Sequence, residues 1–122
     1  MGEAIGNDDL AKRTKDFARR IIHLCQSLPD SREARLIANQ IFRSGTSVGA
    51  NYRAARRGRS RAEFVAKLGI VLEEADETLY WLELLRDSEI VRPELLDDLM
   101  AETHELVSIF VASIKTAKES KQ

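Results

Sequence analysis

Five arginines lie within nine residues of one another near the middle of the chain: Arg53, Arg56, Arg57, Arg59 and Arg61. The planar guanidinium group donates hydrogen bonds in a fork that matches the oxygens of a phosphate. Such a cluster holds the backbone of RNA or DNA without reading its sequence, and binding releases counterions. Ser60 precedes a segment with helical periodicity, and the free N–H groups of a helix start also suit an anion. The cluster therefore predicts a nucleic-acid-binding surface.

Two further groups of polar residues flank this cluster. Arg43, Ser44, Ser47 and Asn51 precede it, whereas Glu74 and Glu77 follow it. If the flanking segments form antiparallel helices, the two groups meet near the middle of both. A buried arginine or asparagine requires such partners. We expect an inward polar layer that fixes the register of the two helices, with a ligand site as the alternative.

Catalytic and metal chemistry have little support in the sequence. Carboxylate-bridged metal sites in helical bundles use Glu-x-x-His pairs, but Arg20 lies three residues before His23 and Ala101 lies three before His104. His23 and Cys25 are two residues apart, which places them on different faces of a helix. No glycine-rich loop follows a strand. We therefore expect a non-enzymatic protein with no catalytic residue, metal or cofactor.

The spacing of apolar residues predicts an all-α protein with four helices. The first helix begins after Asn7 as its N-cap and ends before Pro29, which disfavours helical geometry in the residue before it. Its apolar positions are separated by 7, 4, 3 and 4 residues, which is helical spacing: Leu10, Phe17, Ile21, Leu24 and Leu28.

The second helix runs from about residue 31 to 57, and Asp30 with Glu33 forms a capping box at its start. Gly45 and Gly49 each cost a helix about 1 kcal/mol relative to alanine, so a break near residues 44–47 is the competing interpretation. A continuous helix is favoured because the apolar spacing keeps its phase across this segment. The glycines would then allow a neighbouring helix to approach closely.

The third helix begins at a second capping box, Ser60 to Glu63, just after Gly58. Its apolar face is wider than one bundle seam needs, which is typical of an additional interface between copies of the chain. A loop over residues 87–93 leads to the fourth helix, with Pro93 at its first position. Short connections predict an antiparallel up-down-up-down four-helix bundle.

The bulk composition adds the compartment and the charge pattern. At 122 residues we expect a single domain over residues 1–122, with loose ends at 1–6 and 117–122. One cysteine and the lack of a signal sequence or a membrane-length apolar run indicate a cytoplasmic protein. The net charge is −1, yet residues 43–67 hold seven basic residues and one acid, whereas residues 71–110 hold twelve acids and two arginines. The molecule is expected to be electrically polar.

Three motifs resemble the four-helix-bundle proteins of the bacterial 23S ribosomal RNA intervening-sequence family. They are RSGTSVGANYRAA, SRAEFVAKL and EEADETLYWLELL, over residues 43–55, 60–68 and 73–85. The resemblance implies a left-handed bundle that assembles into a homo-oligomeric ring, often a pentamer. A related branch, the accessory variability determinant of diversity-generating retroelements, partners a reverse transcriptase and binds nucleic acid.

Two functions are consistent with these observations. The first is an oligomeric helical bundle that binds RNA or DNA through the arginine-rich corner between the second and third helices. The alternative is a protein-interaction scaffold, such as a reverse-transcriptase accessory subunit, whose arginines meet the acids of neighbouring subunits. We expect no membrane partner for either function.

Overall fold

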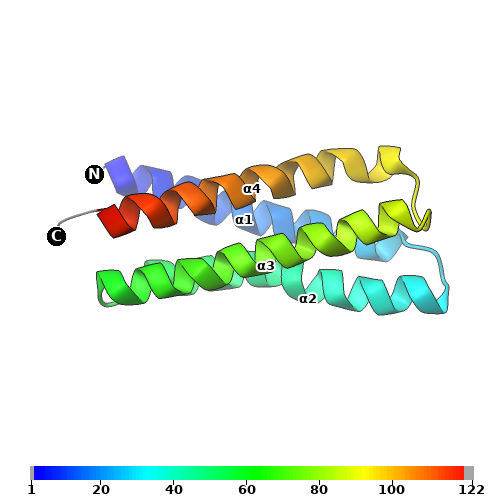
Figure 1. Cartoon of the computed structure of the whole chain (residues 1–122), viewed down its shortest axis with the longest axis horizontal. Coiled ribbons are helices and arrows are strands. Elements are labelled where there is room, and N and C mark those ends of the chain that lie inside the picture. The colour runs from blue at the N-terminus through cyan, green and yellow to red at the C-terminus, as the bar shows by residue number, and fades with distance from the viewer. Residues whose placement is uncertain (1, 120–122) are drawn as a thin grey trace.

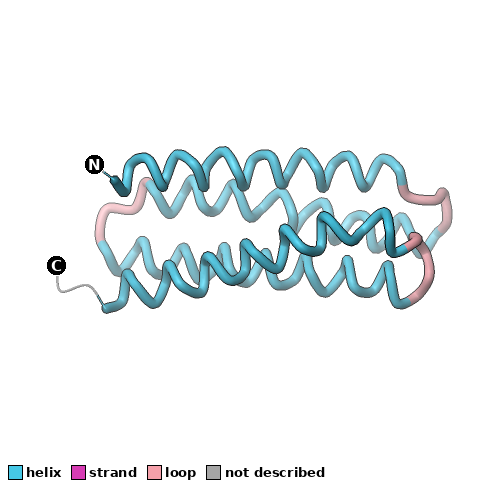
Figure 2. Tube along the Cα trace, turned by 90° about the horizontal axis from the view of Figure 1, so that it is seen from above, coloured by secondary structure: helices cyan, strands magenta, loops and turns pink. Residues whose placement is uncertain are grey.

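Four antiparallel helices make up the part of the chain that the computed structural model describes, residues 2–119, with side chains described from residue 9 onward. They are α1 (Gly2–Ser27), α2 (Arg32–Arg56), α3 (Arg61–Asp87) and α4 (Pro93–Glu119), and no strand occurs within these limits. Consecutive helices reverse direction, so α1 begins and α4 ends at the same end of the bundle (Figure 1). Figure 2 shows the α2–α3 connection at that end and the other two connections at the opposite end. The predicted all-α class is confirmed.

Each helix buries one apolar stripe in a common core. Helix α2 buries Ala34, Ile41, Val48, Tyr52 and Ala55. The other three helices contribute the remaining large buried side chains: Phe17, Ile21, Leu68, Val71, Leu82, Leu85, Leu96, Leu106 and Phe110. Within residues 2–119, none of the helices is both long and apolar enough to cross a bilayer.

Helix α2 is continuous through residues 44–47, as the phase of its apolar residues predicted. The two glycines face α1. A Cβ atom on Gly45 would lie 2.7 Å from Cγ1 of Ile21, and one on Gly49 would lie 3.2 Å from the carbonyl oxygen of Thr14. The helix therefore tolerates these glycines because they allow α1 to approach α2 closely.

The helix starts differ from the predictions in two places. Helix α1 begins at Gly2 rather than after Asn7, so residues 2–6 are helical, as are 117–119; the rest of the predicted loose ends lies outside the described residues. At α2 the N-cap is Ser31, whose hydroxyl accepts a hydrogen bond from Ala34 N–H, rather than Asp30. Asp30 instead pairs with Arg35 at 2.6 Å.

The starts of α3 and α4 follow the predicted motifs, whereas the turn that ends α3 was not predicted. Ser60 caps α3, and its hydroxyl accepts a hydrogen bond from Glu63 N–H. Helix α4 begins at Pro93. Helix α3 ends in a turn in which Ile90 N–H donates to the Leu85 carbonyl and Glu89 N–H donates to that of Arg86. This is the Schellman arrangement, and it holds Glu89 at a positive φ of 60°.

Among the described residues, four serine and threonine side chains are buried with the apolar residues: Thr14, Ser44, Thr78 and Thr103. Thr14 and Thr103 donate to the carbonyl oxygens of Leu10 and Leu99, each one turn earlier in its own helix. Because the hydroxyl of a threonine can donate to a carbonyl oxygen of its own helix, a buried threonine needs no hydrogen-bond partner on another helix.

Candidate nucleic-acid interface

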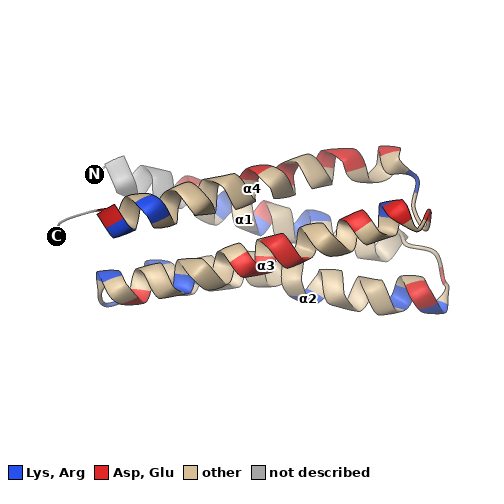
Figure 3. Ribbon diagram, in the orientation of Figure 1, with Lys and Arg blue, Asp and Glu red and all other residues tan. Residues whose placement is uncertain are grey.

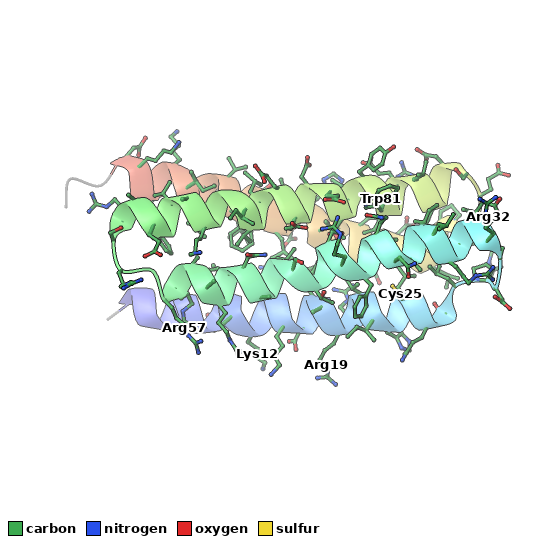
Figure 4. The ribbon with its side chains drawn as sticks, turned by 90° about the horizontal axis from the view of Figure 1, so that it is seen from below. Lys12, Arg19, Cys25, Arg32, Arg57 and Trp81 are labelled. Carbon is green, nitrogen blue, oxygen red and sulfur yellow. The ribbon has the colours of Figure 1, made fainter. Side chains whose placement is uncertain are left out.

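A groove of about 850 Å³ runs between α1 and α2, and it gathers positive charge from both helices. Its basic lining residues are Lys12 and Lys15 from α1, Arg53 and Arg56 from α2, and the C-cap residue Arg57. From residue 9 onward, where side chains are described, no acid lines the groove. In Figure 4, Lys12 and Arg57 lie along the same side of the molecule, with Arg19 further along α1. The groove can therefore place several cations around one bound anion.

The sequence builds this groove from small residues flanked by long cations. Ala11 and Ala18 of α1 and Gly49 and Ala50 of α2 supply small lining residues, together with Thr46. Small side chains leave the seam hollow, whereas lysine and arginine extend their charged heads beyond it. The α2 members follow one another at helical spacing, so they share a face.

Two of the five arginines singled out from the sequence lie outside this groove. Arg59 is in the α2–α3 turn and is exposed, and Arg61 starts α3 and is partly buried. The start of α3 offers an anion fewer donors than the sequence suggested. The carboxylate of Glu63 accepts from Arg59 N–H at 2.7 Å, while Glu63 N–H is bound to the Ser60 hydroxyl.

Acids are concentrated on the opposite half of the bundle. Figure 3 shows carboxylates along the middle of α3 and the first half of α4. They include Glu73, Asp76, Glu94, Asp97, Asp98 and Glu105, all exposed. The structure therefore separates a basic α1–α2 side from an acidic α3–α4 side.

Three residues of the expected polar layer, Arg43, Glu74 and Glu77, come together at the seam between α2 and α3. Arg43 Nη2 lies 2.5 Å from Glu77 Oε2, and Arg43 Nη1 lies 3.5 Å from Glu74 Oε1. The Trp81 ring donates to the same Glu77 oxygen at 3.1 Å. Because the Arg43 side chain is 50% exposed, the layer reaches the surface rather than crossing the core.

The serine and asparagine of that layer are placed differently. Ser44 is fully buried, and its Oγ lies 2.8 Å from the hydroxyl of Thr78, a partner that the sequence did not identify. Ser47 donates to the carbonyl of Arg43, and Asn51 donates to that of Ser47, so both bond within α2. They line the seam without contacting an acid of α3 in any hydrogen bond that we observe.

A second ion cluster, which the sequence did not reveal, joins α1 to α4. Arg13 donates to both carboxylate oxygens of Glu102, at 2.7 and 2.8 Å, and to Glu105 at 2.5 Å. The hydrogen bonds to Glu102 and then Glu105 raise the pKa of the Arg13 guanidinium. The pair lies 89 positions apart in sequence, so no local pattern could signal it.

Cys25 lies half-buried in a second depression on the α1–α2 seam. Its sulfur is 3.6 Å from the carbonyl oxygen of Ala38, and burial raises the pKa of the thiol. No three acidic, histidine or cysteine side chains are grouped to hold a metal ion among the residues described.

Comparisons with known proteins agree on one family. The profile of the family described as 23S rRNA-intervening sequence protein matches residues 7–112. A crystal structure of a protein of unknown function, from the S23 ribosomal protein family of Bacteroides thetaiotaomicron, has 38% sequence identity and a TM-score of 0.83. That alignment covers 89% of this chain and 97% of the other. No curated protein sequence matches the chain.

Proposed function

The chain belongs to the 23S rRNA-intervening sequence protein family, whose name refers to ribosomal RNA, and we propose that it is a non-enzymatic nucleic-acid-binding bundle. The α1–α2 groove holds the phosphate backbone of RNA or DNA. Arg53, Arg56 and Arg57 act as phosphate clamps from α2, and Lys12 and Lys15 act from α1. Arg59 and Arg61 extend the same positive surface around the α2–α3 turn.

One observation carries this proposal: among the side chains that the structure describes, five cations and no acid line a single groove in a chain whose net charge is −1. Cations placed only for solubility are usually interspersed with acids. A run of arginines on one helix is also often a solvated face, but here a second helix adds two lysines to the same groove. Charge of one sign in a concave surface attracts a polyanion and orients its approach.

A binding series in increasing salt tests the proposal. The wild type is compared with Arg53→Gln/Arg56→Gln/Arg57→Gln, using a labelled single-stranded RNA and a DNA duplex. Each phosphate held contributes a slope of about −0.7 to −0.9 to log K against log salt, so the triple variant should lose about 2 from the wild-type slope.

A matched control removes the same charge from the acidic half through Arg86→Gln/Arg92→Gln/Lys115→Gln. This control should bind as the wild type does. A second variant, Arg59→Gln/Arg61→Gln, measures how much the arginines around the α2–α3 turn contribute to binding. Absence of binding at low salt, or equal losses in the triple variant and the control, would contradict the proposal.

We further propose that the chain works as a homo-oligomeric ring, which the family resemblance implies is often a pentamer. Large apolar side chains remain exposed on the single chain, among them Ile22, Ile70, Leu95 and Val111. The chain mass is 13.8 kDa, so light scattering reads the subunit number directly. A monomer at all concentrations would contradict a ring.

The alternative function is a protein-interaction scaffold, including a reverse-transcriptase accessory subunit. The separation of a basic from an acidic half favours it, because the two halves of neighbouring copies are complementary in charge. A ring that dissociates in high salt, without nucleic-acid binding in low salt, would favour the scaffold. A ring that persists in high salt leaves the basic groove available to an outside ligand.

A further inference from the structure

We propose that the α1–α2 face binds a single strand in preference to a duplex, and that one base of this strand stacks on Phe42. This inference rests on the function proposed above and specifies its substrate class. It follows from a second depression on the same seam, which extends the basic groove over most of the length of α2.

The second depression, of about 560 Å³, has an apolar surface and two arginines, of which Arg35 is paired with Asp30 at 2.6 Å. Arg32, Arg35, Leu36, Asn39 and Phe42 line it from α2, and Cys25 lines it from α1. Together with Thr46, Ala50, Arg53 and Arg57 of the basic groove, the α2 residues recur every three or four positions. They form one face of the helix. In Figure 4 this face extends from Arg57 past Lys12, Arg19 and Cys25 to Arg32.

Phe42 is an aromatic side chain between two groups of cations. It is 50% exposed, although burial of a phenylalanine side chain is favourable. Arginines precede it at Arg32 and Arg35 and follow it at Arg53, Arg56 and Arg57. A positively charged track with an aromatic platform is the usual design of single-strand binding sites, in which stacking contributes about 1–3 kcal/mol per base.

A duplex cannot use this arrangement. Its bases are already stacked and paired, so Phe42 reaches no base face unless the helix opens. A single strand has unpaired base faces and a flexible backbone that can follow the seam. From Arg32 to Arg57 the face spans about 37 Å at 1.5 Å per residue, the length of roughly ten stacked nucleotides at 3.4 Å each.

The first test measures affinity for uniform single-stranded oligonucleotides, oligo-U and oligo-dT, against a duplex of equal length. Phe42→Leu removes the ring and keeps an apolar helix-forming residue, and should weaken single-strand binding by roughly 5- to 100-fold. Phe42→Trp should restore binding, and its indole fluorescence should be quenched when a base stacks on it. Affinity should rise with length up to about ten nucleotides and then level off.

A matched control is available on α3. Tyr80 is an aromatic residue that is 56% exposed and lies outside the α1–α2 face, so Tyr80→Leu should leave the affinity unchanged. Light scattering on Phe42→Leu monitors the assembly. If that variant changes the subunit number, Phe42 is a contact between copies of the chain and the stacking role is overturned.

The two proposals fail in different ways. If binding is salt-dependent and needs Arg53, Arg56 and Arg57, but the duplex binds as tightly as the single strand and Phe42→Leu has no effect, only the single-strand inference is overturned. If no oligonucleotide binds at low salt, both are overturned.

Discussion

Replacing Gly45 by alanine tests how closely α1 and α2 approach. The new Cβ would lie 2.7 Å from Cγ1, 2.9 Å from Cγ2 and 3.0 Å from Cδ1 of Ile21. Ile21 is fully buried, and a β-branched side chain in a helix has one strongly preferred χ1 rotamer. The side chain therefore has no easy route out of the contact, and the helices must separate or strain.

Gly69 provides the matched comparison because a Cβ there meets no atom within 4 Å. Gly69→Ala should gain about 1 kcal/mol of stability from helix propensity alone. Gly45→Ala gains the same propensity but incurs about 1–3 kcal/mol of overpacking. The two variants should thus differ by about 1–3 kcal/mol, and each kcal/mol shifts the Tm of a chain of this size by about 4 °C.

Denaturant unfolding followed by circular dichroism measures both variants. A double-mutant cycle with Ile21→Ala tests whether the contact with Ile21 is the cause. Ile21→Ala alone should lower the free energy of unfolding by about 2–5 kcal/mol. The loss in the double variant Ile21→Ala/Gly45→Ala should be at least about 0.5 kcal/mol smaller than the sum of the two single losses. If Gly45→Ala stabilises the protein as much as Gly69→Ala, the Cβ at residue 45 does not clash with Ile21 and the explanation by close approach of α1 to α2 is refuted.

Three further changes test other features. Arg13→Met should lower the free energy of unfolding by about 1–2 kcal/mol, because Glu102 loses a two-point hydrogen-bonded partner, and Arg13→Met/Glu102→Leu should recover part of this loss. Glu89→Gly should raise stability by about 1 kcal/mol, since glycine adopts the positive φ without steric cost. Alkylation of Cys25 by iodoacetamide should reach half its maximal rate at a higher pH in the folded protein than in urea, because burial raises the pKa of the thiol. Stability should correspondingly fall as pH rises from the unfolded toward the folded pKa of this thiol, since only the unfolded state then ionises.

Each of these has a control and a contradicting result. For the ion cluster, an Arg13→Met variant as stable as the wild type would mean that the pairing with Glu102 contributes nothing. For Glu89→Gly the control is Ser88→Gly, one residue earlier, which should destabilise the protein because Ser88 has an ordinary φ of −88°. If both Ser88→Gly and Glu89→Gly raise stability, the positive φ of Glu89 is not the cause of the gain. For Cys25, equal pH midpoints with and without urea would contradict burial as the cause of the shift.

The fold could be predicted because each helix repeats its apolar stripe several times. A stripe such as that of α2 contains enough turns to fix both the helix and its buried face, even across Gly45 and Gly49. The ends were less predictable, because adjacent residues compete for the same role. At α2 both Asp30 and Ser31 can cap a helix, and only the backbone conformation of Ser31 selects it.

The candidate site was only partly predictable, since a groove is made by two helices and the sequence displays one at a time. The arginines lie close together in the sequence at the end of α2 and are therefore visible, whereas Lys12 and Lys15 join them only through packing of α1. The same reason conceals the contact of Ser44 with Thr78. A threonine in an apolar helical stripe does not by itself signal such a contact, because Thr14 and Thr103 donate to carbonyl oxygens of their own helices.

The separation of charge between the two halves of the bundle limits what one copy can hold. When a polyanion is bound on the α1–α2 side of a copy, the acidic residues of α3 and α4 remain exposed to solvent on its other side (Figure 3). A second strand is then repelled by that surface, within a range of about 10 Å at moderate salt. Uniformly basic proteins crosslink and condense nucleic acids, whereas strands covered by this chain should stay separate and soluble.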